Sequence, residues 1–192
     1  TVYTRSAIPQ PDTYQALIAG RDDNDANSEE LDLDGRRFDL RGWPGDSEWI
    51  DHVRGGLADA VPALEQAIGR SWPVSGTFVI HEAYTPGGLG ATNWPTTGGE
   101  AQAGEQLDQR SLLRGLASAW FGTESFSDQW LAEGLADVYT DAALHQLGGV
   151  PVPELYPPAT VAVAGIVDEI GSEKMAAVLE RIETGTGAYD LG

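Results

Sequence analysis

The sequence predicts an α+β domain, with its best strand candidate in the N-terminal half and a mostly helical C-terminal half. Residues 77–81 form a β-branched run bounded by turn residues, which predicts a strand. Apolar residues recur at every third or fourth position over 48–68, which predicts an amphipathic helix. The same helical period returns over 111–139 and in the last third of the chain.

A length of 192 residues suits one domain with a sizeable core, so we expect a single unit over 1–192. We expect four parts within it. Residues 1–47 form an N-terminal arm and loops, and 48–105 form a helix and the sheet. Residues 106–147 form a pair of helices, and 148–192 form the C-terminal helices.

The stretch 21–35 is predicted to be a polar loop. Asp23, Asp25, Asn27 and Asp34 fall at positions 1, 3, 5 and 12 of a calcium-binding loop. Position 6, however, is Ser28 where the sharp turn needs Gly, and position 12 is not the usual bidentate Glu. A solvated acidic loop is therefore the preferred interpretation.

The helix over 48–68 has clear start and stop signals. Asp46 or Ser47 is the expected N-cap, and Gly69 ends the helix. Pro62 lies inside the apolar pattern, which predicts a kink or a break near Val61.

His81 and Glu82 come at the end of the predicted strand, where they invite a reading as a metal or acid–base pair. Successive side chains of a strand point to opposite faces, which argues against that reading.

Residues 111–139 read as two helices separated by a short polar break. The first is expected over 111–121, and the second starts after Asp128, a plausible N-cap, and continues to about Leu147. Further helices are expected over 159–170 and from 173 to about 179, the last with Ser172 as its N-cap.

This helix pair resembles the active-site helices of the gluzincin metallopeptidases, the aminopeptidase-N-like and thermolysin-like zinc enzymes. Their first helix reads HExxH with a tail such as QWFG or AWF, and their second reads WLNEGxAxxY. The matching segments here are Ala119-Trp120-Phe121-Gly122 and Trp130-Leu131-Ala132-Glu133-Gly134-Leu135-Ala136-Asp137-Val138-Tyr139. The resemblance implies a zincin-like catalytic-domain fold, in which a small N-terminal sheet with an edge strand is followed by a mostly helical C-terminal half.

The same alignment implies that the chemistry of the HExxH motif is lost. Its place is taken by Arg114-Gly115-Leu116-Ala117-Ser118, so Arg114 and Ser118 stand at the positions of the two zinc-binding His residues and Gly115 at that of the catalytic Glu. Arg is not a metal ligand, Ser is a poor zinc ligand, and Gly has no side chain.

Glu133 is the only zinc ligand of the family that is retained, and Asp137 stands where the family often has an Asp that orients a ligand His. We therefore expect no cofactor, and zinc only if other groups replace the missing ligands. Our hypothesis is that the Arg114 guanidinium takes the place of the metal and pairs with Glu133, and also with Asp137. The alternative is that both carboxylates lie on a solvated face.

Two further segments resemble the family. Gly90-Ala91-Thr92-Asn93 matches the substrate-binding edge strand, usually G-A-M-E-N, with Thr92 at the position of the Glu that grips a substrate amino terminus. Tyr156 matches the Tyr that donates a hydrogen bond to the oxyanion, although a Tyr beside two Pro residues is more often a packing residue.

Composition limits the possible partners. The formal net charge of -19 argues against nucleic acid and against anionic membrane surfaces. The absence of Cys excludes disulfides and thiolate metal sites, and no apolar run approaches the length of about 20 residues that a membrane span needs. Such acidity is typical of a soluble protein or of one in salty or extracytoplasmic surroundings, and of these possibilities a bacterial extracytoplasmic or secreted protein is favoured.

We therefore expect a catalytically inactive metallopeptidase-like domain, a pseudoenzyme that binds a peptide or protein along its edge strand or serves as a structural module. The alternative is an active aminopeptidase-like gluzincin whose zinc ligands are displaced or substituted. No other His is available at HxxxH spacing, because the chain contains only His52, His81 and His145.

Overall fold

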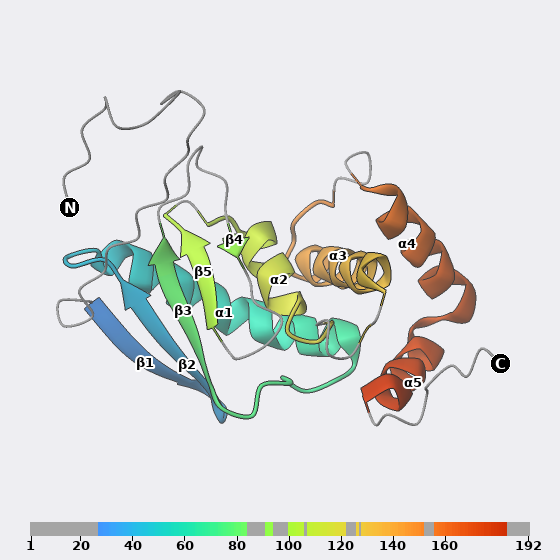
Figure 1. Ribbon diagram of the computed structural model, residues 1–192, viewed down its shortest axis with the longest axis horizontal. Coiled ribbons are helices and arrows are strands. Elements are labelled where there is room, and N and C mark those ends of the chain that lie inside the picture. The colour runs from blue at the N-terminus through green and yellow to red at the C-terminus, as the bar shows by residue number, and fades with distance from the viewer. Residues whose placement is uncertain are drawn as a thin grey trace, which may run out of the picture.

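The computed structural model describes residues 27–83, 91–93, 100–105, 107–121, 126, 128–151 and 156–183. Five strands form one mixed sheet in the order β1-β2-β3-β5-β4 (Figure 1). They are β1 (Asn27–Leu33), β2 (Arg36–Gly42), β3 (Thr77–Ala83), β4 (Ala91–Asn93) and β5 (Glu100–Gly104). Strands β2, β3 and β5 are parallel, whereas β1 and β4 run antiparallel to their neighbours at the two edges. The domain is therefore of the α+β class, as predicted.

The hairpin β1–β2 corrects the predicted N-terminal arm and polar loop from Asn27 onward. Leu33 pairs with Arg36 across a two-residue turn, in which Asp34 has φ 53° and Gly35 has φ 87°. Two successive positive φ angles are what a type I′ hairpin turn requires. Of the four residues proposed for a calcium loop, Asn27 lies in β1 and Asp34 in this turn, while Asp23 and Asp25 lie outside the described residues.

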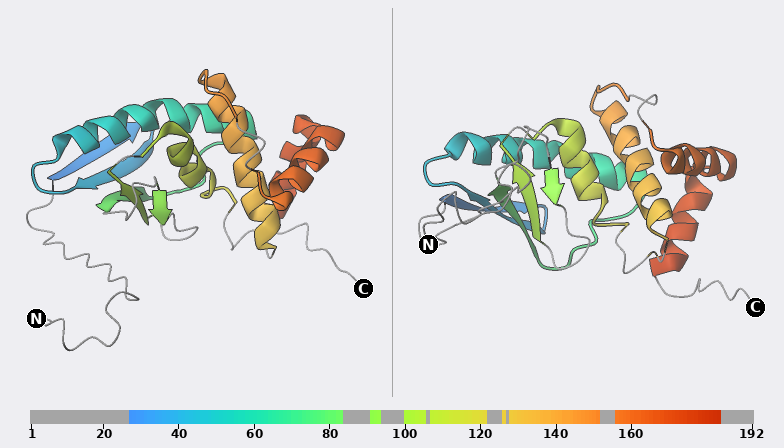
Figure 2. Two further views of the ribbon diagram at one scale, coloured as in Figure 1. Left: turned by 90° about the horizontal axis from the view of Figure 1, so that it is seen from above. Right: turned by 45° about the horizontal axis from the view of Figure 1, so that its top comes forward.

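Helix α1 (Ser47–Ile68) covers one face of the sheet (Figures 1 and 2). The predicted cap is confirmed, because the Asp46 side chain accepts a hydrogen bond from the Trp49 N–H, and Gly69 ends the helix with φ 75°. Of the predicted kink or break near Val61, the break is wrong, since α1 runs on through Pro62. Pro62 lacks the N–H that would bind the Ala58 carbonyl, and both residues lie on the exposed face of the helix.

The core between α1 and the sheet follows from the two periods of the sequence. Every third or fourth residue of α1 is buried against alternate residues of β2 and β3. The largest fully buried members are Phe38, Leu40, Val53, Leu57, Val61, Leu64, Ile68, Phe78 and Ile80.

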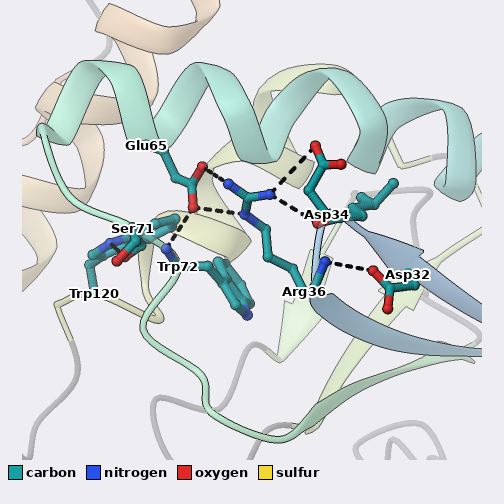
Figure 3. A network of polar contacts seen from close by, with 9 residues as sticks. Asp32, Asp34, Arg36, Glu65, Ser71, Trp72 and Trp120 are labelled. Atoms are coloured by element: carbon teal, nitrogen blue, oxygen red, sulfur yellow. Dashed lines mark hydrogen bonds and ion pairs between the residues drawn. The ribbon is translucent and has the colours of Figure 1, made fainter.

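An ion pair fastens the end of α1 to the beginning of β2 (Figure 3). Arg36 donates from Nε to Glu65 Oε1 at 2.8 Å and from Nη2 to Glu65 Oε2. Glu65 also accepts the Trp72 N–H at 2.7 Å, which fixes the loop that follows the helix. The Trp120 indole donates to the Ser71 carbonyl at 3.0 Å, so the chain after α2 is held on the same loop.

The remaining helices are α2 (Gln109–Ala117), α3 (Gln129–Gln146), α4 (Pro158–Ile170) and α5 (Ser172–Glu183). Helices α2 and α3 pack against α1 and against each other, and α4 packs on α3 (Figure 1). The first predicted helix is too long at its end, because α2 stops before Ser118, while α3 begins after Asp128 as expected. Ser172 is the first residue of α5 rather than its cap.

Gly134 allows α3 and α4 to approach each other closely. A Cβ atom at this position would lie 2.6 Å from Val163 Cγ2 and 3.2 Å from the Ala159 carbonyl oxygen. Only a residue without a side chain fits there without moving α4.

Across the residues that the structure describes, no helix is both long and apolar enough to cross a membrane.

Candidate functional site: the carboxylates between helices α2, α3 and α4

Arg114 joins α2 to α3. Its Nε donates to Asp137 Oδ1 at 2.5 Å, and its Nη1 donates to Ser118 Oγ at 2.8 Å. The Ser118 hydroxyl in turn donates to the Arg114 carbonyl at 3.1 Å, one turn back along the same helix. The two residues at the predicted positions of the ligand His residues therefore bind each other, and Arg114 also binds Asp137.

Asp137 also binds α4. Its Oδ2 accepts the Thr160 hydroxyl at 2.6 Å, and Thr160 is 1% exposed. The Asp137 side chain keeps 14% of its accessible surface and Arg114 keeps 28%. One half-buried carboxylate thus connects three helices, and each of its oxygens has a charged or hydroxyl donor.

A second ion pair lies one helical turn earlier in α2 and one turn later in α3. Arg110 Nε of α2 is 3.3 Å from Asp141 Oδ1 of α3, which gives the two helices an antiparallel register with Arg114–Asp137 as the neighbouring pair. Burial raises the pKa of Asp141, the Arg110 guanidinium opposes this rise, and the Asp137 charge adds to it. The sequence analysis did not identify this pair, although Arg110 and Asp141 stand four residues from Arg114 and Asp137.

The predicted contact between Arg114 and Glu133 is wrong, whereas that between Arg114 and Asp137 is confirmed. Glu133 lies one turn before Asp137 on the exposed part of α3 and accepts the Gln129 side-chain amide at 2.8 Å. The antiparallel register places Asp137 and not Glu133 opposite Arg114. The alternative of a solvated face therefore describes Glu133 but not Asp137.

Two other predicted site residues lie on or next to the same helices. Gly115 is buried in α2. Tyr156 is half-buried just before α4, and no hydrogen bond joins it to another side chain of the cluster among the residues described here.

The predicted edge strand is β4, which pairs antiparallel with β5 at the sheet edge nearest α2. Gly90 lies outside the described residues. In the left view of Figure 2, β4 and the beginning of α3 lie on the side of α2 away from α1.

The residues of this cluster do not fit a zinc ion. Arg114 is committed to Asp137 and Ser118, and no three His, Cys, Asp or Glu side chains lie close enough to hold a metal in the described part of the chain. The three His residues are dispersed, with His52 bound to the Leu107 carbonyl at 2.7 Å, His81 in β3 and His145 near the end of α3.

A separate buried carboxylate lies at the carboxyl end of the parallel strands. Glu82 of β3 is 5% exposed and accepts the Trp43 N–H at 2.6 Å. Burial raises the pKa of Glu82 to about 7, the Trp43 N–H opposes the rise, and the Asp46 and Glu105 charges add to it. The strand period already indicated that Glu82 is buried, because Phe78, Ile80 and Glu82 point to the same face of the sheet, which α1 covers.

No protein-family model matches the chain, and no curated protein sequence matches it.

Proposed function

We propose that this chain is a gluzincin-like domain that no longer uses zinc and that binds a peptide or protein segment without hydrolysing it. The observation that carries the proposal is the contact between Arg114 and Asp137 across α2 and α3. The resemblance assigns the first of these positions to a ligand His and the second to the Asp that orients it. A cation bound to that Asp therefore stands where the enzymes have a ligand.

The chemistry of the neighbouring groups also supports a binding role. A hydrolytic zinc site needs deprotonated or neutral ligands and a carboxylate base beside the first of them. Arg114 keeps its proton, Ser118 is engaged by Arg114, and Gly115 carries no side chain. No group in this part of α2 is able to activate water.

The place for a partner is β4. This strand is at the edge of the sheet and runs antiparallel to β5, next to α2. An extended peptide that adds to such an edge gains main-chain hydrogen bonds without any catalytic group.

The decisive experiment restores the lost motif. The triple variant Arg114→His, Gly115→Glu, Ser118→His recreates HExxH on α2, with Asp137 in position to accept from the new residue 114. We expect the wild type to bind no zinc after dialysis and the triple variant to bind about one zinc ion per chain, measured by metal analysis. The matched control is the double variant Gly115→Glu, Ser118→His, which keeps Arg114 and should stay without zinc.

Two results would count against the proposal. A correctly folded triple variant that binds no zinc would contradict the alignment with the gluzincins. Stoichiometric zinc in the wild type, together with chelator-sensitive cleavage of an aminopeptidase and endopeptidase substrate panel, would establish the active enzyme instead.

The binding role has its own test. An array of extended peptides, read out by chemical-shift changes, should perturb the amides of β4 more than those of β1 at the opposite edge. Thr92→Pro removes a main-chain donor from β4 and should weaken binding by about tenfold, or about 1.4 kcal/mol. Equal perturbation of both edges would contradict a specific site.

A further inference from the structure

Helix α4 leaves most of its apolar surface uncovered. Its side chains are apolar except for Thr160, Asp168 and Glu169, yet only Thr160 and Val163 are buried. Val161 is 57% exposed and Ile166 is 41% exposed. Figures 1 and 2 show α4 at the end of the molecule, with α3 on its inner side. A contiguous apolar face of this kind marks an interaction surface more often than a solvated one.

The exposed residues form one line along the helix. Pro158, Ala162, Gly165 and Glu169 are all exposed, and their spacing of four, three and four residues places them on one face. Val161 and Ile166 flank this line on opposite sides. We call this set the α4 outer face.

The centre of the α4 outer face is made of small residues, and no contact among the described residues explains one of them. A glycine inside a helix costs about 1 kcal/mol relative to alanine. Gly134 is explained by the approach of Val163, but a Cβ atom on Gly165 would meet no described residue within 4 Å. Beside Ala162 on an apolar line, Gly165 provides the space that the backbone of another helix needs for close approach.

The charges at the two ends of α4 indicate the orientation of that second helix. The N-terminus has no side-chain cap and no acidic residue in its first turn, and Asp168 and Glu169 lie in the last turn with no basic residue. This arrangement is unfavourable for the dipole of α4 itself, which favours acidic groups at the start and basic groups at the end. An antiparallel copy of α4 would bring each Glu169 beside the uncapped N-terminus of the other helix.

The same register also places the small residues of the two copies opposite each other. When Pro158 lies opposite Glu169 of the second copy, Ala162 lies opposite Gly165, and both pairs recur by symmetry. We propose that the α4 outer face is a self-association surface through which two copies of this chain form an isologous antiparallel dimer. Self-complementary pairing of this kind is what a two-fold axis requires.

The dimer is expected to be weak. A single pair of short helices buries less than the roughly 1,200 Å² of a standard stable interface. The net charge of -19 on each chain also opposes association, so salt should strengthen it by screening.

Sedimentation velocity over micromolar to millimolar concentrations tests the proposal on the intact chain. The mean mass should rise from 20.4 kDa towards twice that value, and the rise should begin at lower concentration in about 0.5 M salt than in about 0.1 M. Ile166→Asp and Gly165→Leu should each weaken association by at least about tenfold. Gly55→Leu is the matched control, because Gly55 is also an exposed helical glycine with open space around it but lies among polar residues of α1.

Gly165→Leu distinguishes close helix packing from nonspecific hydrophobic association. It enlarges the apolar surface, so it strengthens nonspecific association and blocks the close helix pair. Three results would each overturn the proposal. They are stronger association of Gly165→Leu than of the wild type, a wild type that stays monomeric at every concentration, and a loss of association in Gly55→Leu equal to that in Gly165→Leu.

Discussion

Glu82 should make the stability of the domain fall as pH rises towards neutrality. Its pKa is 4.5 in the unfolded chain and about 7 in the folded protein, because burial disfavours the charged carboxylate. Between these two values the folded state binds more protons than the unfolded state, so the free energy of unfolding decreases with pH. The contribution of Glu82 is fully present below about pH 4.5 and is lost as pH rises through about 7.

The magnitude follows from the size of the shift. A difference of about 2.5 pKa units corresponds to about 3 kcal/mol, of which about 2.5 kcal/mol falls between about pH 5 and pH 8. Other carboxylates act in the opposite direction in acid, so the quantity to measure is a difference between variants. Glu82→Gln keeps the shape and an acceptor for the Trp43 N–H but cannot ionise.

Urea unfolding of the wild type and Glu82→Gln at several pH values is the assay. The stability of the variant relative to the wild type should increase by about 2.5 kcal/mol from about pH 5 to pH 8, which moves the urea midpoint by about 1 M. Glu100→Gln, at an exposed position of β5, is the control and should follow the wild type. A difference between Glu82→Gln and the wild type that stays constant over this range would refute the reasoning.

Three further substitutions test the helix contacts by urea unfolding. Gly134→Ala should cost about 1–3 kcal/mol because the new Cβ meets Val163, and adding Val163→Ala should recover most of the loss. Arg114→Met should cost about 2–3 kcal/mol, since it leaves the half-buried Asp137 without its cation; a loss under about 0.5 kcal/mol would show that the pair contributes little. Asp108→Ala should cost about 1 kcal/mol because its side chain caps α2, and Asp108→Asn should restore most of that stability.

Local sequence signals predicted the elements whose pattern lies within one segment. The helical period and the Asp46 cap identified α1, and the β-branched run identified β3. The hairpin β1–β2 carried an equally local signal, because Asp34-Gly35 stands between alternating apolar residues. The density of charged residues obscured that alternation. Strand β5 is composed of small and polar residues, so only its neighbours in the sheet define it.

The candidate site depended on information that no single segment holds. The motif on α3 was enough to name Asp137 and Glu133, but the choice between them required the antiparallel register of α2 and α3. The contact of Asp137 with Thr160 on α4 was not predictable either, because Thr160 looks like an ordinary residue of an apolar helix. Burial of Glu82 followed from the strand period but needed α1 to cover that face.

The Asp137 carboxylate binds α2 through one oxygen and α4 through the other, and its two partners differ in hydrogen-bonding capacity. The Arg114 guanidinium is able only to donate, so whatever group faces it at residue 137 must accept. The Thr160 hydroxyl is able to donate or accept, so its hydrogen bond is reversible in direction. An asparagine at position 137 would therefore turn its oxygen to α2 and its amide to α4 while keeping both contacts. The charge of residue 137 is thus removable without losing either contact. Only the contact with Arg114 restricts the group at residue 137, because that group must accept a hydrogen bond.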